Sequence, residues 1–416
     1  MAEFTQVSSL TGFFYEIYDK IVDPIPTMAK LMAAVGFKGG ALEIGNKLHV
    51  NVVVSDEGGF SYASRDSGAF AVNPGISFQT QDAQVDAFQL LLQGSVDYES
   101  ASRASSSRKA FLELVGKKLQ VMVASTKRRY ESELWYGQSP QGLGLVESNT
   151  TPTIVITYVE YAPMMWQGKV GQQVDIWATD TTTLRGTFTI ASTNLANRSI
   201  TMTTATTGVV ATDIIMWHGA YNPNLSTPLT CAGAFKIASN TGTLFNINAA
   251  NYDVWAGNTL DCGAKRLLFG LIMQGLSVLA NRGLEGDVTL YCAPSTWATI
   301  VTDQAALRRY GAEQTVMKNG AKAIEFFYMT GKVTIVGHGM IKQGKAILME
   351  TSKWKRIGAQ DFSFKTPGLE EGRDIFWHDP TKAGFSYRYY GAQALFCEMP
   401  SHQLVFTNIL DTAAVP

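Results

Sequence analysis

One long basic segment constrains the architecture of this chain more than any other feature. Residues 105–137 read SSSRKAFLELVGKKLQVMVASTKRRYESELWYG and lie between two stretches with strand-like patterns. Apolar residues recur at a spacing of three and four, on one face of a helix, at Leu112, Val115, Leu119 and Met122. The opening serines can cap free backbone N–H groups, and Gly137 ends the pattern. The segment predicts a helix about 45 Å long, more than a compact domain requires.

The charge on this helix is mostly positive. Seven basic side chains stand against three acidic ones, Glu113, Glu131 and Glu133. Five of the basic residues are candidates for contact with a polyanion or with acids of a neighbouring subunit: Lys117, Lys118, Lys127, Arg128 and Arg129. The alternative is a surface helix whose charges are solvated. The sequence leaves both alternatives open.

Composition points to self-association. The chain has 416 residues, of which 46% are apolar and 17% charged, below the usual quarter for charged residues. Low charge on a large chain indicates that much of the surface is covered, and other copies of the chain are the simplest cover. The formal net charge of −1 argues against a DNA-binding protein steered by an overall positive field. Any contact with nucleic acid must therefore be local.

Cysteine usage and the first residues indicate a cytosolic product without a membrane segment. The four cysteines are far apart in the sequence, which favours buried free thiols over a disulfide or metal framework. The start MAEFTQ lacks the basic and apolar regions of a signal peptide. The longest apolar run, 267–280, is too short to cross a bilayer.

The order of patterns along the chain predicts a mixed α+β protein. An arm, an extended two-stranded loop, the long helix, a β-rich insertion, an α/β unit and closing strands are expected over 1–47, 48–104, 105–149, 150–234, 235–365 and 366–416. The β-rich segment holds 19 threonines and seven charged residues, and it predicts a small barrel or sandwich. Within the α/β unit, residues 260–282 are apolar nearly all round and predict a buried helix ended by Gly283.

Candidate chemistry is weak throughout. The segment GMIKQGKA at 339–346 matches the spacing of a phosphate-binding loop, but Ala346 stands where Ser or Thr would hold magnesium. A hairpin turn is therefore favoured over a nucleotide site. Asp374, His378 and Asp379 are close in sequence but no nucleophile motif accompanies them. No pair of histidines has metal-ligand spacing. The sequence predicts no catalytic, cofactor-binding or metal site.

Four segments carry a resemblance to a known family. They are HVNVVVSD through GSVDYES, SRKAFLELVGKKLQVMVASTKRRYESELWYG, RGLEGDVTLYCAPSTWATIVTDQAALRRY and AGFSYRYYGAQALFCEMPSHQLVFTNI. Their order resembles the major capsid protein of tailed bacteriophages, the Hong Kong 97-like fold shared with encapsulins. The resemblance implies an N-terminal arm, an extended β-loop, a peripheral domain with a long spine helix and closing strands, and an axial domain over 235–365. The small all-β domain at 150–234 would be an insertion.

The resemblance implies a structural protein rather than an enzyme. Such a chain assembles with itself into pentamers and hexamers, which form an icosahedral shell around the double-stranded DNA of a phage. It would be part of the virion and assembled in the cytoplasm of a host bacterium. The alternatives are an encapsulin-type shell that houses a cargo enzyme, or a soluble α/β enzyme that uses GMIKQGKA as a ligand loop.

Two departures from the family pattern bear on partners. Some family members crosslink through a lysine in the extended loop, but no lysine occurs between Lys47 and Lys109. Only about 47 residues precede the loop, too few for a fused scaffolding segment. We therefore expect a separate scaffolding protein, a portal, non-specifically packaged DNA and no covalent crosslinks. A cement or decoration protein on the shell is left open, and no cofactor is expected.

Overall fold

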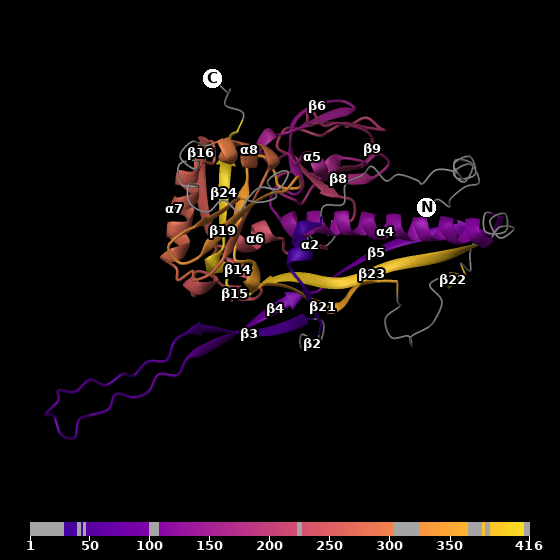
Figure 1. Cartoon of the computed structure of the whole chain (residues 1–416). Coiled ribbons are helices and arrows are strands. Elements are labelled where there is room, and N and C mark those ends of the chain that lie inside the picture. Colours follow the sequence, from indigo (N-terminus) through magenta and orange to yellow (C-terminus); the bar gives the residue numbers. More distant parts are fainter. Residues whose placement is uncertain are drawn as a thin grey trace.

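The computed structural model describes residues 29–39, 43–44, 47–99, 108–222, 227–302, 324–364, 377–378 and 383–411, with 108–116 described by their backbone. Figure 1 shows an elongated molecule. The long helix α4 lies along a set of strands, a sheet with helices stands at one end, and a barrel sits beside the helix. A thin hairpin projects from the strands, away from the rest of the molecule.

The predicted long helix is confirmed as α4, Arg108–Tyr136. It ends where the sequence indicates, and the N–H of Gly137 still bonds to the carbonyl of Glu133 at 2.7 Å. A Cβ at Gly137 would lie 2.1 Å from the carbonyl oxygen of Cys231, so only glycine fits there. Leu119 and Met122 pack in a cluster with tyrosines of a neighbouring strand. The side chains of Leu112 and Val115, and the expected serine cap, lie outside the described residues.

The first sheet lies along α4 and is built from segments far apart in sequence. Its strands are β1 (Phe37–Gly39), β5 (Phe88–Asp97), β21 (Trp354–Ser363), β22 (Trp377–His378) and β23 (Gly384–Cys397). β23 is the long central strand, with β21 and β5 antiparallel on its two sides. Tyr387 and Tyr389 of β23 pack against Met122, so this sheet supports the helix.

The second sheet has six strands in the order β16-β24-β20-β17-β19-β18. These strands are Asn258–Lys265, Leu404–Ile409, Ala346–Met349, Val288–Cys292, Lys332–Gly337 and Ile324–Phe327. Helices α7 (Phe269–Ala280) and α8 (Pro294–Thr302) accompany it. Leu276 of α7 and Leu290 of β17 are buried in one apolar cluster, which is the core of this unit.

The helix predicted over 260–282 is wrong in its first part. β16 occupies 258–265, and α7 begins only at Phe269. Gly263 and Ala264 both have positive φ, +61° and +55°, which interrupts a helix. The strand forms because its partner is β24, a parallel neighbour almost 150 positions later in the chain. α7 is buried along one face, with Gln274 exposed, rather than all round.

Two predicted segment boundaries also differ from the sheets. β24, expected among closing strands of the 366–416 segment, pairs inside the six-stranded sheet with β16 and β20. β21, placed in the 235–365 segment, pairs with β23 in the first sheet. Hydrogen bonding between distant strands, which a linear division of the sequence cannot show, causes both differences.

The threonine-rich segment forms a closed barrel with strand order β10-β7-β6-β11-β8-β9. The strands are Gly144–Thr150, Thr153–Ile156, Gln173–Trp177, Leu184–Asn194, Ser199–Met202 and Ile214–Trp217 for β6 to β11. The expected boundary at 150 is late, since β6 belongs to the barrel. Ile154, Ile176 and Ile200 are fully or almost fully buried and form part of its interior.

Short elements connect these units. They are α2 (Lys30–Ala34), β2 (Glu43–Ile44), η1 (Tyr158–Glu160), α5 (Pro163–Trp166), β12 (Tyr221–Asn222), β13 (Thr227–Pro228), α6 (Ala234–Ala238), β14 (Thr243–Leu244), β15 (Ile247–Asn248), η2 (Asp253–Trp255), η3 (Thr351–Lys353) and η4 (Pro400–His402). The projecting hairpin is β3 (Lys47–Ser55) with β4 (Gln79–Asp86). This confirms the expected extended two-stranded loop.

Candidate assembly surface

The root of the β3–β4 hairpin is anchored to the body of the protein. Leu48 and Val85 are almost fully buried. The side-chain amide of Gln81 donates to the hydroxyl of Tyr252 at 3.0 Å, and the backbone N–H of Gln84 bonds to the turn between β14 and β15. The hairpin is therefore held in a fixed direction at its base.

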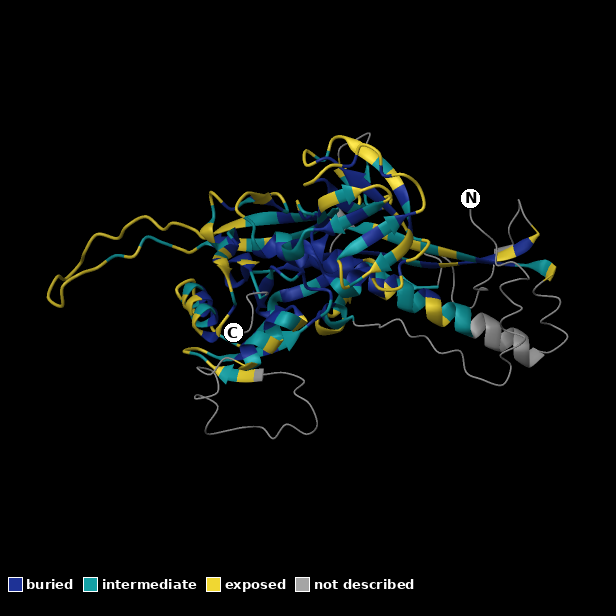
Figure 2. Cartoon of the chain, turned by 90° about the horizontal axis from the view of Figure 1, so that it is seen from above, coloured by how far each residue is buried: buried dark blue, intermediate teal, exposed yellow. Residues whose placement is uncertain are grey.

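The distal part of the hairpin, residues 56–78, has no core of its own. We call it the arm tip. Three of its large apolar side chains are strongly exposed: Phe60 at 72%, Tyr62 at 92% and Val72 at 78%. Its two sides are joined at a bridge between Gly58 and Ile76 and by hydrogen bonds of Asn73. Figure 2 shows the arm tip as exposed along nearly its whole length.

Such an arm tip is suited to contact with another protein surface. Large apolar side chains exposed together on a thin hairpin gain free energy when they are buried, and the hairpin cannot bury them on itself. Unpaired backbone groups along its outer edges can also add to a neighbouring sheet. The tip carries Asp56, Glu57, Asp66 and Arg65 as its charged residues, with no lysine. This composition suits contact with a protein surface better than contact with a polyanion.

The five basic candidates on α4 do not form one surface. Lys127 is exposed and Lys117 is half-buried, so both side chains reach solvent and can contact another molecule. Lys118 donates to the backbone carbonyl of Ser95 at 3.2 Å, and burial lowers its pKa. Arg128 is 7% exposed. Lys118 thus contacts a neighbouring strand, and Arg128 is buried within the protein.

Arg129 joins α4 to the barrel. Its guanidinium lies 4.4 Å from the ring centroid of Trp217, the last residue of β11, and donates to Glu133 at 3.1 Å. The indole N–H of Trp217 in turn donates to the hydroxyl of Ser132. Burial raises the pKa of Glu133, and the charge of Arg129 opposes that rise. Arg129 thus takes part in a contact between α4 and the barrel, and about a quarter of its side chain is exposed.

The end of α4 also holds the short helix α2. The carboxylate of Glu131 accepts hydrogen bonds from the backbone N–H groups of Leu31 and Met32 at 2.8 and 2.9 Å. A third bond comes from the indole of Trp135 at 3.1 Å. The backbone N–H groups of Leu31 and Met32 belong to the first turn of α2, where a negative charge is stabilising. Glu131 therefore holds the first turn of α2 against α4.

A buried ionic cluster joins the barrel to the six-stranded sheet. The carboxylate of Glu160, in η1, lies 2.7 Å from the ammonium of Lys342 and 2.9 Å from that of Lys345. Burial alone would raise the pKa of Glu160, but the two ammonium groups outweigh it and leave that pKa below its usual value. Burial lowers the pKa of Lys342 to about 8.

The strand order contradicts the interpretation of GMIKQGKA as a hairpin turn. β19 and β20 flank β17 on its two sides, so the segment crosses over that strand. The ionic cluster argues against a phosphate loop, because the ammonium of Lys345 is bound to Glu160 and to the side chain of Gln141. The sequence did not predict Glu160 and Lys342 as a pair. A lone acid within the apolar stretch ITYVEYAPMMW was the available signal.

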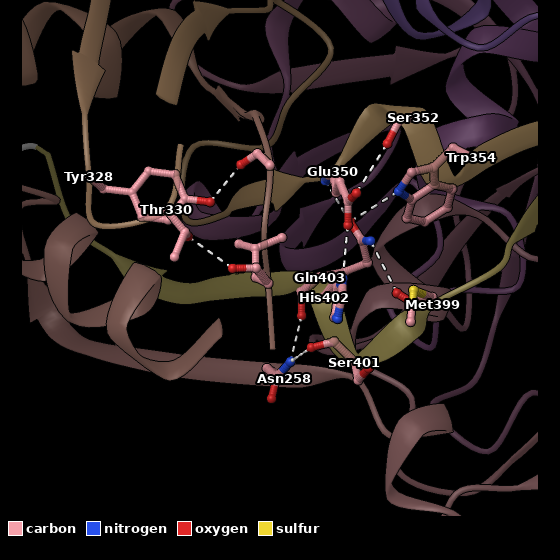
Figure 3. A network of polar contacts seen from close by, with 12 residues as sticks. Asn258, Tyr328, Thr330, Glu350, Ser352, Trp354, Met399, Ser401, His402 and Gln403 are labelled. Carbon is pink, nitrogen blue, oxygen red and sulfur yellow. Dashed lines mark hydrogen bonds and ion pairs between the residues drawn. The ribbon is translucent and has the colours of Figure 1, made fainter. Parts of the chain in front are cut away.

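A second polar network joins the two sheets (Figure 3). The ring of His402 lies 2.9 Å from the carboxylate of Glu350, whose other oxygen accepts from the hydroxyl of Ser352. The side chain of Gln403 accepts from the indole of Trp354. Because the serine donates to the carboxylate rather than to the histidine, no nucleophile is paired with a base. The network is structural.

Groups that could hold a metal ion are absent from the described residues. All four cysteines are buried and free, as expected. Asp374 and Asp379 lie outside the described residues, as does the side chain of His378. Among the helices that the structure describes, none has the length and apolar character needed to cross a bilayer.

Comparison with known proteins identifies the fold. No family model matches the chain, and no curated protein does. Among solved structures, a chain of the cyanophage A-1(L) capsid asymmetric unit is 10% identical, with 94% of each chain covered and a TM-score of 0.52.

Two further structures are more distant. A chain of the capsid of a native GTA particle is 9% identical over 94% and 93% of the two chains, with a TM-score of 0.47. The holo-SrpI encapsulin complex from Synechococcus elongatus PCC 7942 gives 10% identity over 97% of each chain and a TM-score of 0.39. The cyanophage match, at its low identity, shows the fold alone: this chain has the mixed α+β fold of a phage capsid protein.

Proposed function

We propose that this chain is a structural major capsid protein, not an enzyme. It assembles with itself into pentamers and hexamers that form an icosahedral shell around the double-stranded DNA of a phage. The observation that carries this proposal is the arm tip, an anchored hairpin whose exposed aromatic residues have no partner surface within the described chain. The fold shared with a cyanophage capsid chain supports it.

The anchored root gives the arm tip its role in assembly. Because Leu48 and Val85 fix the hairpin to the body, burial of the tip on a second copy also fixes the relative position of the two subunits. A flexible arm would bind without setting geometry. Repetition of one such heterologous contact around an axis closes a ring, and rings of five and six close a shell.

The proposed partners follow from this role. A separate scaffolding protein and a portal would direct assembly in the cytoplasm of a host bacterium, and the product is the virion. DNA would be packaged without sequence preference, since phosphate attraction does not depend on sequence. Lys117 and Lys127 of α4 are the two candidates left for contact with DNA or with acids of a neighbouring subunit.

The test removes the apolar side chains of the arm tip. Phe60, Tyr62 and Val72 are changed together to serine, and the purified protein is imaged by electron microscopy. We expect folded subunits with an unchanged melting temperature, because these side chains are exposed, and a loss of closed shells. Normal shells would overturn the proposal.

A matched control lies in the same hairpin. Ala63, Ala69 and Ala71 are also exposed, and changing them together to serine adds the same hydroxyls without removing large apolar surface. We expect this variant to assemble normally. Mass spectrometry and nucleic-acid analysis of particles from infected cells then separate a phage capsid, which contains DNA, from an encapsulin-type shell, which contains a cargo enzyme.

A further inference from the structure

A cavity of about 340 Å³ lies where the long helix, the barrel and α6 meet. Its walls come from the end of α4, the end of β11, the strands β12 and β13, and α6. The lining is mostly apolar and includes the rings of Tyr136, Trp217 and Tyr221. Cavities of this size and character, at the junction of folded units, are typical of sites that bind small molecules.

Close packing between α4 and α6 fixes one side of the cavity. The ring of Tyr136 stacks on that of Phe235, with centroids 5.0 Å apart and planes 8° apart. The backbone N–H of Gly233 bonds to the carbonyl of Gly137 at 2.8 Å. A Cβ at Gly233 would lie 2.6 Å from the carbonyl oxygen of Trp135, so the two segments cannot approach more closely. The cavity is therefore formed in advance, and a ligand would not have to order its walls.

Lys236 places a positive charge on the wall of this cavity. The other four residues of α6 are buried, whereas Lys236 is half-buried and lines the cavity. Burial lowers the pKa of Lys236, and no charged group of the described chain adds to that shift or opposes it. Residues 223–226, between β12 and β13, include no acid. An anion bound beside this ammonium would offset the cost of its partial burial.

The acid on the cavity wall does not supply that counter-charge. Glu133 also lines the cavity, but its carboxylate accepts a hydrogen bond from Arg129 at 3.1 Å. The charge of Arg129, and not that of Lys236, opposes the rise in the pKa of Glu133. The uncompensated charge at the cavity is therefore positive, which favours an anionic ligand over a cationic one.

We propose that the cavity binds a small apolar anion, with its apolar body against Tyr136, Trp217 and Tyr221 and its anionic group at the ammonium of Lys236. The volume sets the size of that body. A cavity of about 150 Å³ holds one benzene ring, so 340 Å³ has room for a body of about two fused rings. The site goes beyond the proposed assembly function, because a single chain supplies all of its walls.

The experiment titrates the purified full chain with 2-naphthoate, which has two fused rings and one carboxylate, and measures binding by calorimetry. 2-Naphthamide is the matched neutral probe, because it has nearly the same shape without the charge. We expect the carboxylate to bind about 10-fold more tightly or better, as a hydrogen bond to a charged partner contributes. Equal affinities for the two probes, or no binding of 2-naphthoate, would overturn the proposal.

Variants then locate the bound probe. Lys236→Met should weaken 2-naphthoate about 10-fold and leave 2-naphthamide unchanged, whereas Lys236→Arg should keep the preference for the carboxylate. Ala220→Leu fills part of the cavity and should weaken both probes. Lys127→Met is the control, since Lys127 is exposed on α4 and does not line the cavity.

A thermal transition checks that each variant is folded. The proposal fails if folded Lys236→Met binds 2-naphthoate as tightly as the wild type, or if folded Ala220→Leu binds both probes unchanged. The comparison of the two probes on the wild type needs no variant, so it decides the charge preference even where a substitution prevents folding.

Discussion

The ammonium of Lys342 and the carboxylate of Glu160 lie 2.7 Å apart, although 182 positions separate them in the sequence. Lys342 is fully buried and also donates to the backbone carbonyl of Gly142 at 2.9 Å. Its own backbone N–H donates to the hydroxyl of Tyr136 at the end of α4. One lysine thus joins the long helix, the barrel and the six-stranded sheet.

The two partners of this pair should not be equivalent on mutation. Glu160→Gln leaves Lys342 buried without a counter-charge, and we expect a loss of about 3–5 kcal/mol in the free energy of unfolding. Lys342→Met should cost less, because Lys345 remains to neutralise Glu160. Glu147→Gln is the control, since its ion pair with Arg198 is exposed, and should cost less than about 1 kcal/mol. Chemical denaturation measures all three.

Lys342 should also make stability depend on pH. Its pKa is about 8 when folded and about 10.5 in the unfolded chain, so the unfolded state binds more protons between these values. The charged lysine therefore costs stability below pH 8, and the cost is relieved as pH rises. Between pH 8 and 9.5 we expect wild type to gain stability relative to Lys342→Met. A constant difference between the two would contradict this.

Particles should contain no covalent multimers formed through the extended loop. An isopeptide bond requires a lysine, and none occurs between Lys47 and Lys109. Mature particles boiled in detergent should release a monomer of 45.3 kDa on a denaturing gel. A ladder of larger species would show that residues elsewhere in the chain form crosslinks.

The basic residues of α4 should separate into two classes. Lys117→Gln with Lys127→Gln should leave stability nearly unchanged, because both side chains reach solvent, and should reduce the DNA retained in closed particles if these residues face DNA. Arg129→Gln should instead destabilise the subunit by about 1–3 kcal/mol, since it leaves buried Glu133 unpaired. Equal effects on stability from both changes would contradict this division.

The barrel should fold on its own but with lower stability than in the full chain. The fragment 143–219 contains all six strands of the closed barrel and the buried interior around Ile176. It loses the contacts of Trp217 with Ser132 and Arg129 of α4. We expect a cooperative thermal transition below that of the full chain, followed by circular dichroism. Absence of any transition would show that the barrel depends on α4 for folding.

Local patterns predicted most elements of this fold. Alternation in HVNVVVSD gives β3, and the three-to-four spacing through Met122 gives α4. β16 was missed because Leu260 and Leu267 continue a helical spacing, while the partner strand β24 lies far along the chain. Gly263 and Ala264 both have positive φ, but only the glycine could signal this conformation in the sequence.

The polar contacts that position the candidate surfaces were harder to predict. Arg129 was named as a candidate for contact with DNA or a neighbouring subunit, but it packs on Trp217, almost 90 residues away, so the sequence could not indicate this internal contact. Lys236 is the one charged residue of AGAFKIA, and its sequence neighbours do not show that it lines a cavity. Which charges are buried is decided by tertiary packing, not by spacing.

The place of β24 has a consequence for synthesis. Residues 404–409 lie between β16 and β20, in the interior of the six-stranded sheet, and Phe406 is fully buried there. A ribosome makes this strand after every other strand of the sheet. The six-stranded sheet therefore cannot be completed until residue 409 has left the ribosome. Prematurely terminated chains leave β16 and β20 without the strand between them. Incomplete subunits therefore lack the surface that the complete six-stranded sheet forms.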